Sequence, residues 1–153
     1  IGKVFAEAKG SMFLGRGYSF PIALEGALKL KELAYVHAEG YPAGEMKHGP
    51  LALIEEGMPV VVLAPRDEHY KKTISNMQEV IARGAKVLLI TNKNKDEVIS
   101  ENIWEKIEVD QLDDELIPFL ITIPLQKLAF YSALEKGYDI DKPRNLAKSV
   151  TVE

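Results

Sequence analysis

Two stretches near the middle of the chain decide its fold: "MPVVVLAP" (residues 58–65) and "AKVLLIT" (residues 85–91). Each is a short apolar run rich in valine or leucine, and prolines bound the first of them. A strand with one face in water alternates apolar and polar residues, whereas these two are apolar on both faces. They therefore predict a parallel sheet that helices cover on both sides.

The flanking sequence continues this alternation of strand and helix outward from the centre. Further strands are expected over residues 12–17 ("MFLGRG") and 104–109 ("WEKIEV"), the second with the pattern of an edge strand. Helices are expected over residues 19 to about 37, 67 to about 83 and 114 to about 136. This order predicts an α/β fold, a three-layer α/β/α sandwich around a four- or five-stranded, mainly parallel sheet.

The composition is that of one ordinary globular domain. The chain has 153 residues, of which 46% are hydrophobic and 27% charged, enough to bury a core. We divide it into a domain over residues 1–137 and a C-terminal tail over residues 138–153. The chain begins with Ile1 rather than Met, so we expect it to be a piece of a longer protein.

Charge and cysteine content argue against several kinds of partner. The net charge of −4 argues against nucleic acid, which requires a basic face. The absence of cysteine excludes disulfides and thiolate metal sites, and it fits a cytoplasmic protein. The most apolar run, "LIPFLITIPL" (residues 116–125), is shorter than the roughly 20 residues that cross a bilayer, and it contains two prolines. We interpret this run as a buried helix and expect no membrane partner.

A loop crowded with titratable groups is expected after the first long helix. It reads "EGYPAGEMKHGP" (residues 39–50), and in it a Gly-Pro pair follows His48 and fixes the backbone there. A histidine near neutrality can move protons, although a lone loop histidine is more often structural. We expect no metal, because Glu39, Glu45 and His48 match no ligand spacing.

The helix before this loop carries the other candidate acid–base group. Glu25, Lys29 and Glu32 follow one another at intervals of four and three residues, so they share one helix face. One interpretation is a solvated row of ion pairs, each worth about 0.2–0.5 kcal/mol. The other is a general base, Glu32, whose carboxylate the lysine tunes. Gly26 in the same helix indicates that a neighbouring element packs closely there.

Two further segments carry groups that could react with a substrate or bind one. Lys148 lies in the C-terminal tail, and tails are usually mobile. A lysine in a pocket of low dielectric can instead lose its proton and attack a carbonyl. Arg16 lies in the glycine turn "GRG" after the first strand, where α/β proteins often bind phosphate. No dinucleotide fingerprint or Walker lysine accompanies this turn, so a surface ion pair is the alternative for Arg16.

Three stretches together resemble one known family. They are "ALEGALKLKELAYVHAEGYPAGEMKHGPLALI" (residues 23–54), "IPLQKLAFYSALEKGYDIDKPRNLAKSVTVE" (residues 123–153) and "LGRG" (residues 14–17). They resemble the C-terminal half of the glucosamine-6-phosphate synthase family, glutamine–fructose-6-phosphate aminotransferase (isomerizing). The resemblance covers essentially the whole chain and implies that it is the second of two sugar isomerase (SIS) domains.

The resemblance also implies a role for each candidate residue. Glu32 matches the family's general base, which moves a proton between C1 and C2 of the sugar, and Lys29 matches its partner lysine. His48 matches the histidine that opens the sugar ring in the neighbouring subunit's site. Lys148 matches the lysine that forms a Schiff base with open-chain fructose 6-phosphate, and Ala147 beside it offers its backbone to the substrate phosphate.

The partners that follow from the resemblance are fructose 6-phosphate and glucosamine 6-phosphate, a first SIS domain, an N-terminal glutaminase domain that releases ammonia from glutamine, and a second copy in a homodimer. No cofactor is implied.

One departure from the family pattern concerns the phosphate site. Residues 22–72 contain no serine or threonine, although SIS domains that hold a sugar phosphate usually present a loop rich in both. We therefore expect the main phosphate site in the first SIS domain and an inactive isolated fragment.

Two alternatives stay open at the level of sequence. The first is a related SIS enzyme, a sugar-phosphate deaminase or isomerase that runs similar chemistry without glutamine. The second is a non-catalytic module that senses a sugar phosphate or mediates dimerisation.

Overall fold

A computed structural model describes residues 1–93 and 102–144. Its helices are α1 (Gly2–Glu7), α2 (Ser19–Ala34), α3 (Tyr70–Ile81) and α4 (Ile117–Glu135). Its strands are β1 (Ser11–Gly15), β2 (Ala38–Pro42), β3 (Pro59–Leu63), β4 (Lys86–Asn92) and β5 (Glu105–Val109). Two short 3-10 helices, η1 (Ala43–His48) and η2 (Pro50–Leu53), connect β2 to β3.

The five strands form one parallel sheet in the order β2-β1-β3-β4-β5. All residues of β1 and β3 are buried, which explains their continuous apolar sequence. At the edge, β5 keeps exposed residues on one side, as its alternating pattern indicates. The predicted parallel sheet is therefore confirmed, with five strands.

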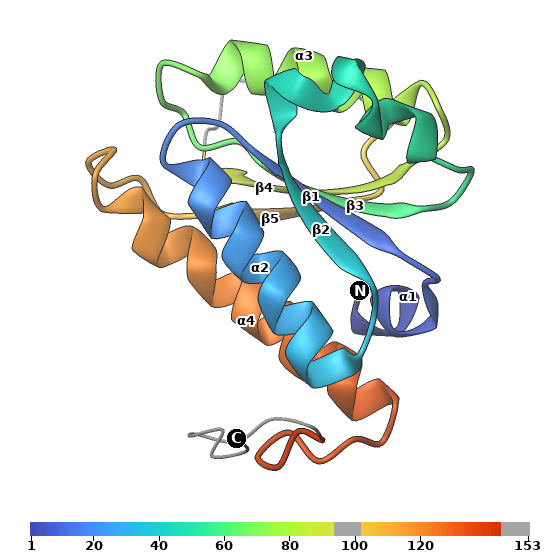
Figure 1. The fold of residues 1–153 in the computed structure, drawn as a ribbon. Helices are drawn as coiled ribbons and strands as arrows, with labels where there is room; N and C mark the ends of the chain where they lie inside the picture. Colours follow the sequence, from blue (N-terminus) through green and yellow to red (C-terminus); the bar gives the residue numbers. More distant parts are fainter. Residues whose placement is uncertain (94–101, 145–153) are drawn as a thin grey trace, which may run out of the picture.

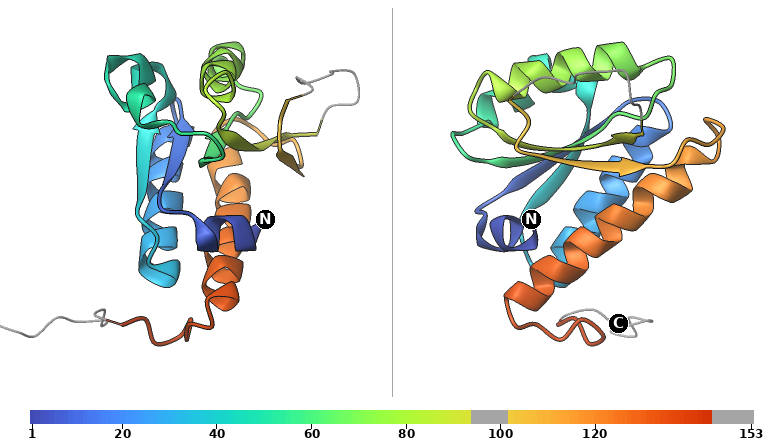
Figure 2. Two further views of the ribbon diagram at one scale, coloured as in Figure 1. Left: turned by 90° about the vertical axis from the view of Figure 1, so that its right-hand side faces the viewer. Right: turned by 180° about the vertical axis from the view of Figure 1, so that it is seen from behind.

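Helices cover both faces of the sheet, as Figures 1 and 2 show. On one face α2 and α4 pack side by side over alternate strand residues such as Phe13 and Val61. On the other face α3 and η1 cover the intervening residues, among them Leu14 and Val62. Because side chains alternate across a strand, two separate apolar clusters result, one in each layer. The predicted three-layer sandwich is confirmed.

The strand β2 was not expected, and the prediction that residues 39–50 form a loop throughout is wrong. Ala38–Pro42 pairs in parallel with β1 along its whole length. The segment lacks apolar alternation because it lies at the sheet edge and because Gly40 passes under α2. A Cβ at Gly40 would lie 2.9 Å from the backbone N and Cα of Leu24. Close contact between helix and strand therefore requires glycine here, although glycine is rare in strands.

The helix α2 ends at Ala34, three residues before the predicted end. Tyr35 follows in the left-handed region with φ 53° and ψ 37°, and its N–H donates to the Lys31 carbonyl. This conformation reverses the chain direction without glycine. The close packing that Gly26 indicates is confirmed, since a Cβ there would lie 2.9 Å from Leu125 Cδ1 of α4.

The helix α4 is longer than the apolar run that predicts it. Its 19 residues are long and apolar enough to cross a bilayer by length and composition, so the argument from a short run does not hold for the whole helix. In the described structure α4 packs against α2 and α1, and residues such as Ile121 and Leu125 are fully or almost fully buried. One face of α4 therefore belongs to the core, whereas Phe119 and Ile123 are 72% and 48% exposed, so the predicted buried helix is buried on one side only.

Candidate active site

The first part of the site is an ion pair on the last two turns of α2. Lys29 Nζ lies 2.5 Å from Glu32 Oε2 and 3.7 Å from Glu25 Oε1. The side chains of Lys29 and Glu32 each keep 29% of their surface exposed, so they are accessible but shielded from bulk water. The structure therefore brings together the two α2 residues that the sequence singles out, with Lys29 shared between two carboxylates.

This geometry fixes the charge of Lys29. Its hydrogen bond to Glu32 raises the pKa of the Lys29 ammonium above its usual 10.5, although partial burial opposes the shift. Lys29 is therefore an ammonium at neutral pH and has no lone pair with which to attack a carbonyl. Its chemical role is to place positive charge beside the Glu32 carboxylate.

The chain after α4 returns to the same end of α2. The Tyr138 ring lies 4.9 Å from the Tyr35 ring between centroids, and Lys136 Nζ donates to the Ala34 carbonyl at 2.8 Å. Further along, the Arg144 backbone N–H donates to the Tyr35 hydroxyl at 2.7 Å. The start of the tail is thus attached three residues beyond Glu32. Ala147 and Lys148 lie outside the described residues.

His48 lies on the other side of the sheet, at the end of η1. Its imidazole is 72% exposed, and its Nδ1 lies 2.7 Å from Glu45 Oε2, one turn earlier. A carboxylate at Nδ1 orients the ring and leaves Nε2 free to face outward. Sequence reasoning treated Glu45 only as a metal ligand that lacked partners, and its spacing of three residues from His48 was the available signal.

Side-chain contacts hold η1 against the rest of the domain. Lys47 Nζ lies 3.0 Å from Glu79 Oε1 of α3, and Met46 is fully buried beneath the segment. Arg16 reaches over from the end of β1 and donates from Nε to Asn76 Oδ1 at 3.2 Å. A Cβ at Gly44 would lie 2.3 Å from the Arg16 guanidinium, so a larger residue there would displace the Arg16 side chain. His48 is therefore presented outward from a fixed support.

Glu32 and His48 cannot meet within one copy of the domain. The sheet separates the α2 layer from the layer that contains η1, and with helix diameters near 10 Å the two layers are roughly 20 Å apart. Figure 1 shows η1 at the top of the molecule and the end of α2 at the bottom, beside the tail. The two candidate acid–base groups thus serve different surfaces.

The glycine turn after β1 is filled by protein groups. A Cβ at Gly15 would lie 2.3 Å from the Ser19 carbonyl oxygen, so the start of α2 already occupies the space beyond the turn. The Arg16 side chain is directed to Asn76, and Ser11 donates its hydroxyl to the Pro59 carbonyl at 3.0 Å. Arg16 therefore links the end of β1 to α3.

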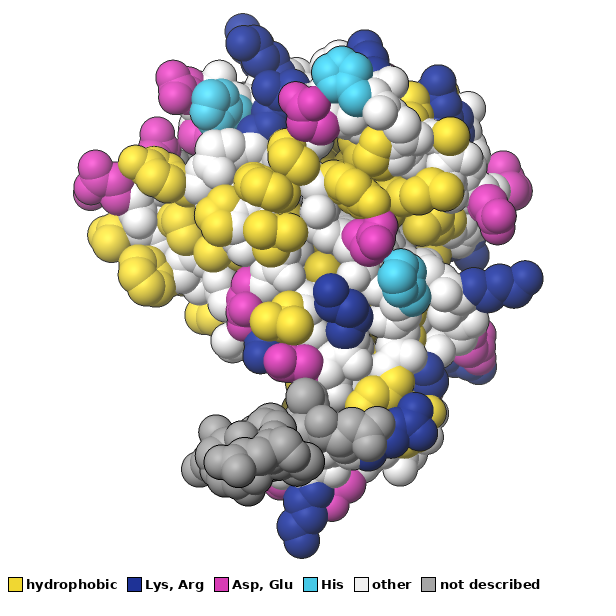
Figure 3. Space-filling view, viewed as in Figure 1, with side chains coloured by type: hydrophobic (Ala, Val, Ile, Leu, Met, Phe, Trp, Pro, Cys, Tyr) yellow, Lys and Arg dark blue, Asp and Glu magenta, His cyan; other side chains and the backbone are white. Residues whose placement is uncertain are grey.

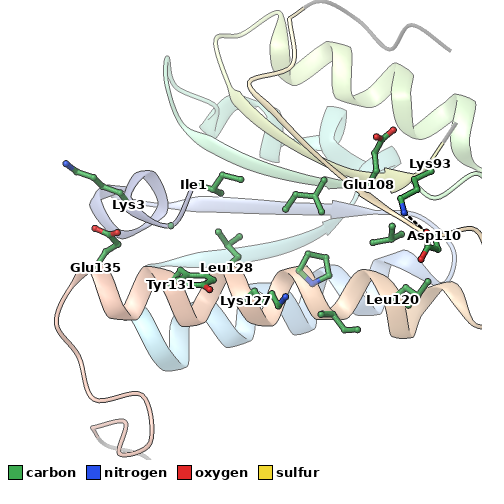
Figure 4. Close-up of a pocket in the computed structure, with 15 residues that line it drawn as sticks. Ile1, Lys3, Lys93, Glu108, Asp110, Leu120, Lys127, Leu128, Tyr131 and Glu135 are labelled. Atoms are coloured by element: carbon green, nitrogen blue, oxygen red, sulfur yellow. Dashed lines mark hydrogen bonds and ion pairs between the residues drawn. The ribbon is translucent and has the colours of Figure 1, made fainter. Parts of the chain in front are cut away.

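An apolar cleft among the described residues lies away from Lys29 and Glu32. It has a volume of about 660 Å³ and runs between α4, β5 and the N-terminal residues (Figure 4). Its walls include Val109, Ile123 and Tyr131, and Lys93 pairs with Asp110 at its rim. Within residues 1–93 and 102–144, no cluster of three histidine or acidic residues could hold a metal ion.

Comparisons with known proteins give one consistent family. A family model described as "SIS domain" matches residues 4–136. The chain is 54% identical over 153 residues to glutamine–fructose-6-phosphate aminotransferase (isomerizing) of Rhizobium meliloti (strain 1021). This alignment covers all of the present chain and 25% of that protein. Identity is 56% over 142 residues to the protein of the same name from Brucella abortus, over 93% of this chain and 23% of that one. The chain thus spans about a quarter of the length of these curated relatives.

Solved structures agree with this similarity. The C-terminal domain of glucosamine-fructose-6-phosphate aminotransferase from Francisella tularensis superposes with a TM-score of 0.87 at 48% identity, over 92% of this chain and 40% of that chain. Glucosamine-6-phosphate deaminase from Thermotoga maritima superposes with a TM-score of 0.72 at 28% identity, over 97% and 44% of the two chains.

Proposed function

The chain belongs to the SIS domain family, and we propose that it forms the second SIS half of the isomerase part of a glutamine–fructose-6-phosphate aminotransferase (isomerizing). The observation that carries this proposal is the Lys29–Glu32 pair at 2.5 Å, beside which the tail bearing Lys148 is attached. The proposed product is glucosamine 6-phosphate, formed from fructose 6-phosphate and ammonia. The proposed division is a SIS domain over residues 1–137 and a catalytic tail over residues 138–153.

The proposed reaction assigns each group one step. His48 passes the proton that opens the sugar ring, and the Lys148 amine attacks the C2 carbonyl of the open chain, with loss of water, to give an imine. Ammonia then replaces the lysine nitrogen at C2. The Glu32 carboxylate takes a proton from C1 and returns it to C2, while the proton of the C1 hydroxyl passes to the nitrogen, which leaves an amine at C2 and an aldehyde at C1. These steps need no metal or cofactor.

The separation of Glu32 and His48 supports a shared active site in a homodimer. His48 of one copy would complete the site that Glu32 and Lys148 form in the other copy. The exposed imidazole, aimed outward by Glu45, fits a group that serves a neighbour. A single copy holds only one part of the acid–base chemistry at each surface.

Other domains of the same polypeptide are proposed to supply what the chain lacks. The filled turn at Gly15 and the absence of serine and threonine over residues 22–72 support a phosphate site in a first SIS domain. A glutaminase domain would supply ammonia, and a cytoplasmic location fits these substrates.

Exposed apolar side chains support such domain contacts. Leu24 and Leu28 of α2 and Phe119 and Ile123 of α4 are 40% to 72% exposed, and the last belongs to the apolar cleft. Figure 3 shows hydrophobic side chains gathered on the face that carries α2.

The test is the substitution Glu32→Gln in the complete protein. Loss of a general base lowers a rate by about 10²–10⁴-fold, so glucosamine 6-phosphate formation should fall by that factor while glutamine hydrolysis continues. The matched control is Glu25→Gln, which removes the more distant carboxylate of the same lysine and should retain most activity. Normal product formation by Glu32→Gln would refute the proposed role. Product formation from free ammonia in a protein without glutaminase activity would favour the deaminase alternative.

A further inference from the structure

The apolar cleft beside α4 lies where one layer of the sandwich covers the sheet only in part. The edge strand β5 turns Ile107 and Val109 toward the layer of α2 and α4, and both side chains are only partly buried there. Within the described residues, α2 packs on β1 and β2, and α4 packs mainly on α2 and α1. Apolar side chains of β5 therefore face the cleft, where a fully covered sheet would have a helix.

The opposite wall of the cleft is the side of α4 that faces away from α2. Ile123 and Tyr131 are about half exposed there, and Leu120 lies with them along the wall. A helix with apolar residues on all sides is normally covered on all sides. In the described structure α2 covers one side of α4, and the cleft leaves the other side open.

The length and the rim of the cleft suit an amphipathic helix. From Tyr131 back to Leu120, α4 rises about 16 Å at 1.5 Å per residue, which is the length of a helix of about three turns. Charged side chains of both signs stand around the apolar walls, Lys127 and Glu135 on α4 and Glu108 on β5. Such a rim fits the polar flanks of a helix whose apolar stripe faces inward.

The backbone enters α1 from this cleft. Ile1 lines the cleft with its side chain 44% exposed, and its carbonyl accepts the N–H groups of Val4 at 3.0 Å and Phe5 at 3.4 Å. Gly2 brings this end of α1 close to α4, because a Cβ there would lie 2.9 Å from Tyr131 Cβ. The first turn of α1 is therefore already seated against the cleft wall.

The position of Ile1 gives the direction in which a preceding helix would run. Figure 4 shows Ile1 on the cleft side of α1 and Lys3 on its far side, with Leu120 toward the other end of the cleft. In the right-hand view of Figure 2 the N-terminus likewise lies between β5 and α4. A helix that continued α1 backward from Ile1 would therefore run along the cleft, beside α4.

We propose that the cleft is an intramolecular docking site for the polypeptide that precedes Ile1 in the complete protein, which forms a helix continuous with α1. The inference rests on the proposed function, which places a first SIS domain before this chain. About three quarters of the length of the curated relatives lies outside the matched segment. The docked helix turns apolar side chains at intervals of three and four residues toward Ile123 and Val109. It completes the layer of α2 and α4 and connects the two SIS domains rigidly.

The first test is thiol labelling in the complete protein. Ile123→Cys places a thiol in the cleft, and the matched control Ser75→Cys places one on the exposed surface of α3, on the other face of the sheet. N-ethylmaleimide should label position 123 more than about 10-fold more slowly than position 75, because a covered thiol reacts only when the covering segment opens. Quantifying each labelled peptide by mass excludes signals from cysteines elsewhere in the protein.

A second variant protects the labelling test against misfolding. Lys127 lines the cleft one turn beyond Ile123 and is exposed, so Lys127→Cys removes no buried apolar contact. Labelling of Lys127→Cys should be slow in the same way if a helix lies over this wall.

The second test identifies what fills the cleft. Ile123 is replaced by the photo-cross-linker p-benzoylphenylalanine in the complete protein, and cross-linked peptides are mapped by mass after irradiation. Position 123 should be joined, within one polypeptide, to a peptide from the roughly fifteen residues before Ile1, which a helix along the cleft brings into range.

Slow labelling at both cleft positions together with this cross-link would support the inference. Labelling as fast as at Ser75→Cys would overturn it, because the cleft would be open. A cross-link to a second copy or to another part of the polypeptide would overturn it by identifying a different occupant. Protection without any peptide cross-link would also overturn it, in favour of a small molecule or a lipid. Neither readout needs enzyme activity, so failure here is distinguishable from failure of the Glu32→Gln test.

Discussion

The end of α2 and the end of η1 show how this domain presents reactive groups in two different ways. At the end of α2, Lys29 and Glu32 are paired on a regular helix with 29% of each side chain exposed. The chain after α4 returns to Tyr35, three residues further on. At the end of η1, His48 is exposed on a short irregular segment and has one carboxylate partner, Glu45. The first region is built to receive a chain segment, and the second projects away from its own domain.

Under the proposed function, this difference means that each surface of the domain supplies one half of a catalytic unit. Proton transfer requires the reacting groups within hydrogen-bond reach of the substrate. The sheet keeps the layers that carry Glu32 and His48 roughly 20 Å apart, given helix diameters of about 10 Å. A second copy can supply the histidine without any rearrangement of the fold.

After Glu32→Gln, the largest effect should come from removing the positive charge of Lys29 at the end of α2. Lys29→Met keeps the length of the side chain and leaves Glu32 without its cation, so we expect isomerisation to fall about 10–100-fold, as for loss of a charged hydrogen bond. His37→Ala, which removes a more exposed side chain paired with Glu39, is a control outside the Lys29–Glu32 pair. Unchanged isomerisation in Lys29→Met would show that the ion pair is only structural.

The same pair predicts a direction for stability against pH. The folded pKa of Lys29 lies above its unfolded value of 10.5, so the stabilisation is fully present below pH 10.5 and is lost as pH rises through the folded pKa. Urea unfolding of the parent and of Lys29→Met should therefore differ by a constant amount from about pH 7 to 9. The difference should shrink above pH 10.5. A difference that grows with rising pH would contradict the ion pair.

The next effect concerns the element that joins the two regions, strand β2. Gly40→Ala places a Cβ 2.9 Å from the Leu24 backbone and should force β2 away from α2. Such overpacking typically costs about 1–3 kcal/mol of unfolding free energy. Gly10→Ala meets its nearest neighbour at 3.7 Å and serves as the matched control, with an expected change of less than about 0.5 kcal/mol. Equal stability of the two variants, measured by urea unfolding, would show that β2 can shift freely.

The smallest effect should come from the partner of His48. Glu45→Gln keeps a hydrogen-bond acceptor for Nδ1 and removes the charge, so we expect a two- to fivefold loss in the rate of ring opening, about the net worth of one hydrogen bond. Ring opening is measured with the substrate itself, and an analogue whose ring cannot open serves as the reference. A variant at Glu55, which is exposed at the opposite end of the connecting segment, provides the control. A loss as large as that of a His48 substitution would mean that Glu45 itself touches the substrate.

The sequence predicted those features that depend on local pattern. The apolar strands β3 and β4 and the shared face of Lys29 and Glu32 follow from the periods of strand and helix, and the structure confirms them. The strand β2 was missed because its glycine and proline content follows from contacts with α2 and not from strand propensity. Tertiary contact here overrode local preference.

The attachment of the chain after α4 to Tyr35 could not be predicted for a different reason. Its hydrogen bond joins Tyr35 and Arg144 across 109 positions of sequence, and nothing local to Tyr35 indicates a left-handed turn. The role of Arg16 was also missed, because its partner Asn76 lies 60 positions away. Long-range side-chain contacts leave no periodic signal, so only the three-dimensional structure reveals them.

The most direct test of a shared active site is complementation between two inactive variants of the complete protein. Glu32→Gln and His48→Ala are purified separately, unfolded and refolded together in equal amounts, and assayed for glucosamine 6-phosphate formation. If each site takes Glu32 from one copy and His48 from the other, half of the molecules are mixed dimers with one intact site, and about a quarter of parental activity should return. If both groups serve their own copy, every site retains one defect, and mixing would restore nothing.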